Sequence, residues 1–172
     1  MNTEEISREL EERLSEAEKI LVGIGPEWKT GDEAREILVK KAGETLGALL
    51  EGKDHYVVST LSGEEFERLG LKNVHAVTPL DVSLTEEQWN AYTEWLSRTL
   101  NRKLVILELG ENFLRPSVMR WPFEKTAELN LKACMFRVHK TFSQIPDELK
   151  GKAFPVKADS VEFMASLTAD RN

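Results

Sequence analysis

The chain has 172 residues, of which 41% are hydrophobic and 31% charged, values that are ordinary for one soluble globular domain spanning residues 1–172. Its formal net charge of −7 disfavours nucleic acid as a partner, because an acidic surface repels a polyanion. The one cysteine, Cys134, excludes an internal disulfide and a cysteine-based zinc site, and it suits a reducing compartment.

Membrane and export signals are missing from the sequence. No apolar run approaches the roughly 18 residues that a membrane-spanning helix needs. The first ten residues lack the basic flank and apolar centre of a signal peptide. We therefore expect a soluble, cytoplasmic protein with no membrane partner.

The chain opens with an amphipathic helix over residues 3–17. Ile6, Leu10, Leu14 and Ala17 recur there at helical spacing and form an apolar stripe. If this stripe were exposed, it would favour a homodimer formed through the N-terminal helix.

Strand and helix signals then alternate to the end of the chain. Apolar or β-branched runs predict strands over 19–25, 55–61, 73–79, 103–110, 132–139 and 152–158. The last of these is an edge strand, because Pro155 cannot donate to a ladder. Helices are predicted over 30–51, 62–70, 85–100, 118–130 and 159–167.

Cap residues mark the starts of four helices. Thr30, Ser62 and Thr85 each precede a Glu or Gln by three residues, which is the spacing of a capping box. Asp159 is a natural cap for the last helix. The helix over 85–100 is expected to bury a stripe made of Trp89, Tyr92, Leu96 and Leu100.

The rhythm of elements predicts the fold class. Apolar strands joined by helices indicate a parallel sheet covered on both faces. Right-handed crossovers make this a doubly wound, Rossmann-like α/β fold of about six strands. Ligands of such sheets bind beyond the carboxyl ends of the strands, so we expect a crevice at the turns after the first, second, fourth and fifth strands.

The first of these turns partly matches a phosphate-binding turn. Gly23 and Gly25 fit the first two glycines of G-x-G-x-x-G. Trp28 stands where the third glycine belongs, and Pro26 removes an N–H donor. The alternative interpretation is a plain glycine turn at the end of a strand.

The turn after the fourth strand carries polar groups suited to a nucleotide. Glu111 can accept hydrogen bonds from a ribose diol, and Arg115 and Arg120 can pair with a phosphate bidentately. Solvation or ion pairing within the protein is the competing role for both arginines. Glu108, inside an apolar strand, either pairs with an arginine or serves the site.

The three histidines are not equally good candidates for ligand contact. His139 ends the fifth strand and is the best candidate for ligand contact, whereas His75 lies within a strand and is expected to pack. No two histidines share metal-ligand spacing, so we predict no metal site.

Three segments resemble sirtuins, most of all the bacterial macrodomain-linked type: residues 56–70, 107–124 and 134–167. The second reads LELGENFLRPSVMRWPFE, close to the family pattern L-E-L-G-x-x-x-x-T-P-x-x-I-R-x-P-F-E. The resemblance implies a Rossmann-like sheet that binds NAD and carries an inserted zinc module. It also implies removal of acyl groups from lysine, or transfer of ADP-ribose, at the expense of NAD.

Departures from the family fall on its functional residues. Leu61 and Gly63 replace the asparagine and aspartate that position NAD and a reactive water. The catalytic histidine falls near Thr78 or Pro79, and the cysteines of the zinc module are missing. His139 replaces the ribose-binding asparagine, and the long cofactor loop after the first strand is cut out.

These losses predict a sirtuin-like pseudoenzyme with no catalytic residue, which binds a nucleotide such as NAD or ADP-ribose or else a protein partner. The alternatives are an NAD-consuming deacylase or ADP-ribosyltransferase rewired around Glu111 or His139, and a purely structural protein. The candidate cofactor-binding residues are Gly23, Gly25, Ser59, Thr60, Gly110, Glu111, Asn112, Arg115 and His139.

Overall fold

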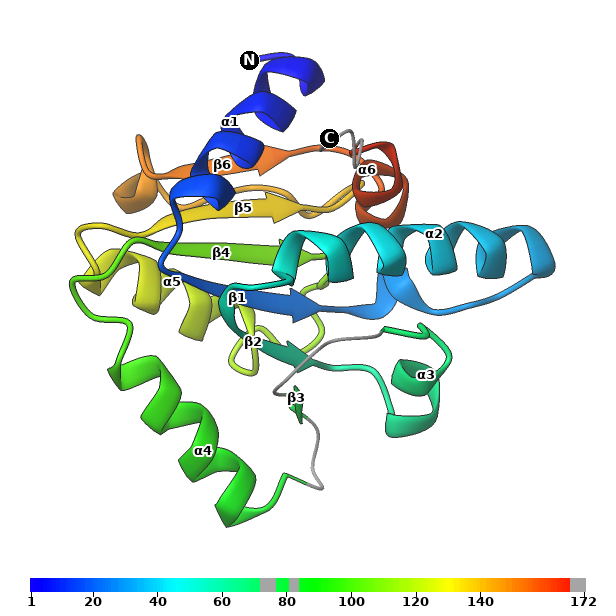
Figure 1. Ribbon diagram of the computed structural model, residues 1–172, viewed down its shortest axis with the longest axis horizontal. Helices are drawn as coiled ribbons and strands as arrows, with labels where there is room; N and C mark the ends of the chain where they lie inside the picture. The colour runs from blue at the N-terminus through cyan, green and yellow to red at the C-terminus, as the bar shows by residue number, and fades with distance from the viewer. Residues whose placement is uncertain (72–76, 81–83, 168–172) are drawn as a thin grey trace.

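The strands form one parallel sheet that winds outward from its middle (Figure 1). The computed structural model describes residues 1–71, 77–80 and 84–167. Five strands of four to six residues make up most of the sheet: β1 (Lys19–Ile24), β2 (Asp54–Ser59), β4 (Leu104–Leu109), β5 (Cys134–Val138) and β6 (Ala153–Val156). A three-residue segment, β3 (Val77–Pro79), pairs with β2 at one edge. The order β3-β2-β1-β4-β5-β6 reverses the winding between β1 and β4.

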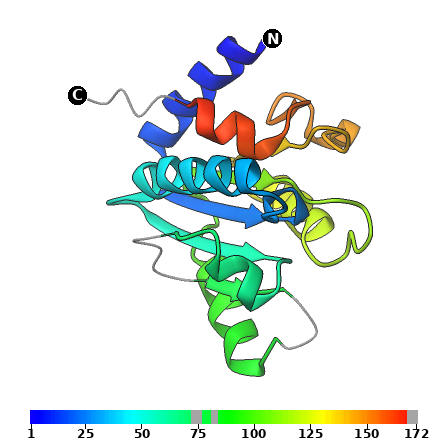
Figure 2. The same ribbon diagram turned by 90° about the vertical axis from the view of Figure 1, so that its right-hand side faces the viewer.

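Helices cover both faces of the sheet (Figures 1 and 2). They are α1 (Thr3–Glu16), α2 (Glu33–Leu50), α3 (Gly63–Glu67), α4 (Glu86–Ser97), α5 (Arg120–Leu129) and α6 (Ser160–Ser166), with short 3-10 turns η1 (Pro26–Trp28) and η2 (Asp147–Leu149). Alternate residues of each strand face opposite ways: Val22 packs in the core beneath α1, α2 and α6, and Leu21 packs in the core beneath α4 and α5. The predicted α/β class, parallel sheet and Rossmann-like winding are confirmed. The full count of six strands and the sirtuin type stay predictions, and His75 lies outside the described residues.

The apolar stripe of the N-terminal helix is covered by the rest of the chain. Ile6, Leu10 and Leu14 are buried in the same core as α2 and α6. The helix therefore completes one layer of the domain. This removes the exposed stripe that would have favoured a homodimer through α1, and the homodimer itself stays a prediction.

Three predicted caps are confirmed and one is wrong. Ser62, Thr85 and Asp159 cap α3, α4 and α6. The cap of α2 is Asp32, whose carboxylate accepts the N–H of Arg35 at 2.8 Å. Thr30, the predicted cap, lies two residues too early, because the helix begins only at Glu33 and an aspartate is already in place to cap it.

The predicted stripe on α4 is only partly buried. Tyr92 is buried against Tyr56, with ring centroids 5.4 Å apart. Trp89 and Leu100 are 50% and 55% exposed. The physical reason is position: α4 lies at the β3 edge of the sheet (Figure 1), where there is too little sheet surface to cover a whole helix face.

Candidate functional site

The glycines of the first turn make room for the protein's own atoms. A Cβ at Gly23 would lie 2.6 Å from Met119 Sδ and from the Phe123 ring, so this glycine lets α5 approach β1. A Cβ at Gly25 would lie 2.5 Å from Glu111 Cα. The turns after β1 and β4 thus touch at the point where the winding reverses.

The backbone donors of the first turn are already used. The N–H of Gly25 donates to Leu109 O at 2.9 Å, and the N–H of Glu27 donates to Gly110 O at 3.2 Å. Pro26 has no N–H to offer. A pyrophosphate at this turn would find none of the backbone donors on which a glycine-rich phosphate site depends.

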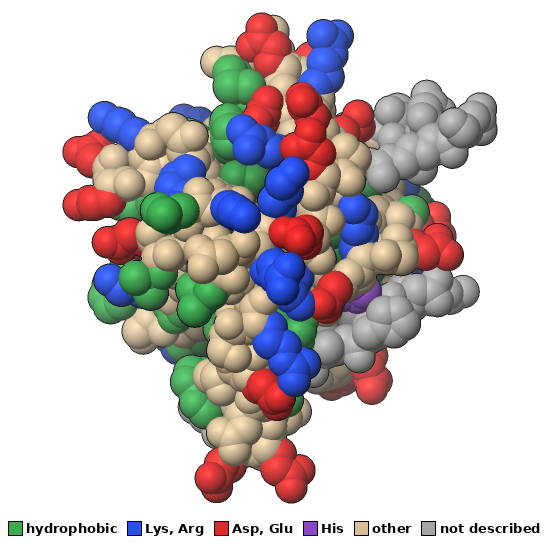
Figure 3. Space-filling view, turned by 60° about the vertical axis from the view of Figure 1, so that its left-hand side comes forward, with side chains coloured by type: hydrophobic (Ala, Val, Ile, Leu, Met, Phe, Trp, Pro, Cys, Tyr) green, Lys and Arg blue, Asp and Glu red, His purple; other side chains and the backbone are tan. Residues whose placement is uncertain are grey.

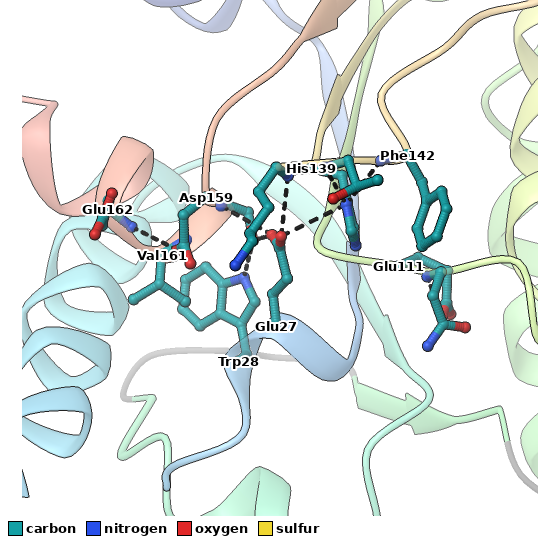
Figure 4. A network of polar contacts seen from close by, with 12 residues as sticks. Glu27, Trp28, Glu111, His139, Phe142, Asp159, Val161 and Glu162 are labelled. Atoms are coloured by element: carbon teal, nitrogen blue, oxygen red, sulfur yellow. Dashed lines mark hydrogen bonds and ion pairs between the residues drawn. The ribbon is translucent and has the colours of Figure 1, made fainter. Parts of the chain in front are cut away.

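A carboxylate from the protein, that of Glu27, lies at the carboxyl end of β5, where the sequence predicts part of the crevice. It accepts the N–H of Lys140 at 3.0 Å, the N–H of Ser160 at 2.9 Å and the Ser160 hydroxyl at 2.6 Å. Figure 4 shows this carboxylate between the ends of β5 and α6. Gly110, at φ +75°, leaves the space for it, since a Cβ there would lie 2.6 Å from Glu27 Cβ.

Neighbouring contacts hold Glu27 in place. Trp28 is fully buried, and its Nε1–H donates to Ser160 Oγ at 3.1 Å. Arg35 donates to the backbone carbonyl of Glu27 and pairs with Asp159 at 2.9 Å. Glu27 therefore sits on a short, anchored turn.

His139 is committed to its own turn. Its Nδ1 accepts the N–H of Thr141 at 2.9 Å and that of Phe142 at 2.8 Å. An Nδ1 that accepts carries no proton, and burial lowers the pKa of the imidazole, with the Glu27 carboxylate opposing the shift. The ring is thus neutral and fixes the loop after β5.

Three more predicted residues serve turns or face solvent. The Ser59 hydroxyl donates to Ile24 O at 2.8 Å and accepts the N–H of Leu61 at 3.1 Å. Asn112 Oδ1 accepts the N–H of Leu114 at 3.0 Å. Arg115 is exposed.

Four buried polar atoms on the α5 side have no hydrogen-bond partner among the described residues. They are Thr60 Oγ1, Glu111 Oε2, and Nε and Nη2 of Arg120. The other oxygen of Glu111, Oε1, accepts the N–H of Asn112 at 3.0 Å. Burial raises the pKa of Glu111. The N–H of Asn112 opposes this, and so, less strongly, does the nearby Thr60 hydroxyl, although its geometry falls short of a hydrogen bond.

Arg120 is fully buried, and only one of its three guanidinium nitrogens has hydrogen-bond acceptors among the described residues. Its Nη1 donates to Glu111 O at 3.2 Å and to Phe142 O at 2.9 Å. The Phe113 ring covers the guanidinium, with its centroid 3.9 Å from Cζ. Nε and Nη2 together form one edge of the guanidinium, here called the free edge, and such an edge binds carboxylate or phosphate through two parallel hydrogen bonds. Arg120 has no ion-pair partner in the described part of the chain.

Glu108 is paired within the protein. It binds Arg137 across the β4–β5 pair, and Arg137 also reaches Glu124 at 2.8 Å. Burial raises the pKa of Glu108 while Arg137 counteracts the shift. The prediction that Glu108 pairs with an arginine is confirmed.

Of the predicted residues, Thr60 and Glu111 each have a side-chain oxygen with no hydrogen-bond partner among the described residues. At Gly23, Gly25 and Gly110 other protein atoms pack in the space that a side chain would fill. Sequence reasoning missed Glu27 as a filler of the crevice. It named Arg120 as a phosphate partner without separating it from Arg115. The signal for Arg120 was its place at the start of an amphipathic helix, where a charged side chain must either face solvent or be buried with partners.

Comparisons with known proteins give no match: no protein-family model fits the chain, and no curated protein is similar enough to count as a relative. Within the described residues, none of the helices combines the length and hydropathy needed for a bilayer crossing. In the same residues, no three His, Cys, Asp or Glu side chains gather as metal ligands would.

Proposed function

We propose that this protein is a sirtuin-like binding module that takes up a nucleotide-type ligand without catalysing NAD-dependent chemistry. One observation carries the proposal: the free edge of Arg120, fully buried at the carboxyl ends of the strands. Parallel α/β sheets place their ligands at this end.

The energetics of a buried guanidinium favour an anionic ligand. Burying a charge is costly unless it is paired and hydrogen-bonded. Among the described residues, the carboxylates of Glu108, Glu124 and Glu111 act on Arg120 without forming an ion pair, and two of its donors lack acceptors. A phosphate or carboxylate would supply the charge and both acceptors at once. The ligand would thus supply the partners that Arg120 lacks among the described residues.

The absence of catalysis is inferred from the residues at the family's functional positions. Leu61, where the resemblance places an asparagine, is buried in the core, and Gly63 begins α3 without a side chain. His139 uses Nδ1 to hold its own turn. A general base needs a titratable group within reach of the substrate, and neither Leu61 nor Gly63 supplies one.

Calorimetric titration with NAD, ADP-ribose and AMP tests the proposal. We expect heat of binding for at least one of these with the native protein, and a loss of at least tenfold in affinity for Arg120→Lys, which keeps the charge but not the fork. Arg98→Gln, at an exposed arginine of α4, is the matched control. Failure of all three ligands to bind would refute the proposal, and release of nicotinamide from NAD would favour the rewired enzyme.

A protein-interaction role is the second candidate, and exposed apolar residues favour it. Leu100, Leu129 and Leu131 are 55%, 61% and 86% exposed. Their segments are adjacent, because Asn130 Nδ2 donates to Thr99 O at 2.7 Å. Figure 3, which brings forward the left-hand side of Figure 1, shows hydrophobic side chains on one flank and mixed charges beside them. Leu129→Ser and Leu131→Ser would abolish binding of such a partner in a pull-down.

A further inference from the structure

We infer that the ligand is a monophosphate of a sugar, such as a 5′-mononucleotide or a pentose phosphate, and that dinucleotides and diphosphates are excluded. This inference rests on the proposed function and narrows it to one class of ligand. It depends on three features of the crevice: one free anion position, one free acceptor for hydroxyls, and one anion position that the protein itself fills.

The free anion position is the edge of Arg120. Its two donors, Nε and Nη2, match two oxygens of one phosphate group. The remaining nitrogen, Nη1, is held by the carbonyls of Glu111 and Phe142, which fixes the direction of the fork. One phosphate fits this edge.

The acceptor for hydroxyls lies beside it. Glu111 Oε2 and Thr60 Oγ1 lie near one another, are buried, and have no hydrogen-bond partner among the described residues, and Arg120 is bonded to the backbone of Glu111 itself. A carboxylate there repels a second phosphate but accepts hydrogen bonds from sugar hydroxyls. A ligand that carries hydroxyls next to its one phosphate satisfies both groups, whereas inorganic phosphate satisfies only Arg120.

The second anion position is closed. Glu27 takes the donors at Lys140 and Ser160, and Trp28 anchors the turn that carries it (Figure 4). The contact of Gly25 with Glu111 separates this position from the free edge of Arg120. A second phosphate would find both backbone donors taken and would meet a carboxylate.

Phe113 covers one face of the Arg120 guanidinium. Its ring lies on the guanidinium and meets the Phe142 ring edge-on at a centroid distance of 5.3 Å. Phe113 is 48% exposed, so the side chain can turn toward solvent without leaving a core position.

The test is titration of the native chain with ribose 5-phosphate, AMP, inorganic phosphate, NAD and ADP-ribose. We expect ribose 5-phosphate and AMP to bind at least tenfold more tightly than inorganic phosphate, NAD or ADP-ribose. Equal affinity for inorganic phosphate and ribose 5-phosphate would overturn the inference. NAD or ADP-ribose binding as tightly as AMP would overturn it too, and would leave the proposed function standing. No binding of any nucleotide would overturn both.

Substitutions locate the two halves of the ligand. Glu111→Gln removes a negative charge, so we expect inorganic phosphate to bind more tightly and ribose 5-phosphate more weakly, with a fall of at least fivefold in the ratio of the two affinities. Arg120→Lys should weaken both ligands, and Arg98→Gln is the matched control. If Arg120→Lys fails to fold, the opposite changes in the two affinities of Glu111→Gln still test the inference. An unchanged ratio of the affinities for ribose 5-phosphate and inorganic phosphate in Glu111→Gln would overturn it.

Discussion

Buried charges in this protein fall into two kinds. Arg137 is satisfied by Glu108, by Glu124 and by the carbonyl of Gln144. Arg120 lies on the same side of the sheet, but among the described residues its hydrogen bonds go only to two carbonyls and a ring covers it, while Glu108, Glu124 and Glu111 act on it electrostatically without forming an ion pair. The difference separates a structural ion pair from the group that we propose binds a ligand.

The pH dependence of stability is expected to reveal the buried carboxyl of Glu111. Burial raises its pKa in the folded state, so the protonated form favours folding, and this contribution is lost as pH rises from the ordinary value near 4.5 through the raised one. Glu111→Gln should therefore be more stable than the native protein at pH 7, with the advantage shrinking toward pH 4. Melting temperatures across this range measure it; an advantage that is constant with pH would contradict the assignment.

Breaking the structural ion pair should be costly. Arg137→Met leaves Glu108 buried and unpaired, which is expected to destabilise the fold by about 3–5 kcal/mol at neutral pH. Urea denaturation measures the loss, and Arg102→Met, at an exposed arginine, is the control. A loss near that of the control would show that Glu108 has other partners.

At the scale of elements, caps decide where helices begin. Asp32 and Thr30 both precede α2. Asp32 is its cap, because its carboxylate accepts the backbone N–H of Arg35 in the first turn. Ser62 and Thr85 were recognisable because a Glu or Gln follows each at the right spacing. Thr30 has the same spacing to Glu33, so the capping-box spacing alone could not decide whether Thr30 or Asp32 caps α2.

A pair of substitutions separates the two candidate caps. Asp32→Ala should cost about 0.5–2 kcal/mol of unfolding free energy, because it leaves the N–H of Arg35 without its acceptor. Thr30→Ala should change stability by less than about 0.5 kcal/mol. Chemical denaturation of both variants gives the comparison, and the reverse order would mean that α2 begins earlier.

At the scale of the whole molecule, α1 completes the domain. Leu10 is fully buried in the core that it shares with α2 and α6. Leu10→Ala is therefore expected to cost about 2–5 kcal/mol, whereas Glu12→Ala, on the exposed side of the same helix, should cost little.

The same packing predicts how stability depends on concentration. If α1 packs within its own chain, the melting temperature should not change over a hundredfold range of protein concentration, because no association is coupled to unfolding. A melting temperature that rises with concentration would instead support a homodimer whose subunits stabilise one another.

The sequence by itself determined the elements, the parallel sheet and the end of it where a site belongs, because strand burial and helix amphipathicity are local periodic patterns. The tertiary structure alone decided what fills that site. Glu27 meets Lys140 and Ser160 across 113 and 133 residues of chain, and Arg120 meets the carbonyls of Glu111 and Phe142 from separate turns. No local pattern encodes such contacts, since they arise only when the sheet brings its loops to one edge. Among the described residues, the same folding that places the Glu27 carboxylate between Lys140 and Ser160 leaves the free edge of Arg120 without a partner.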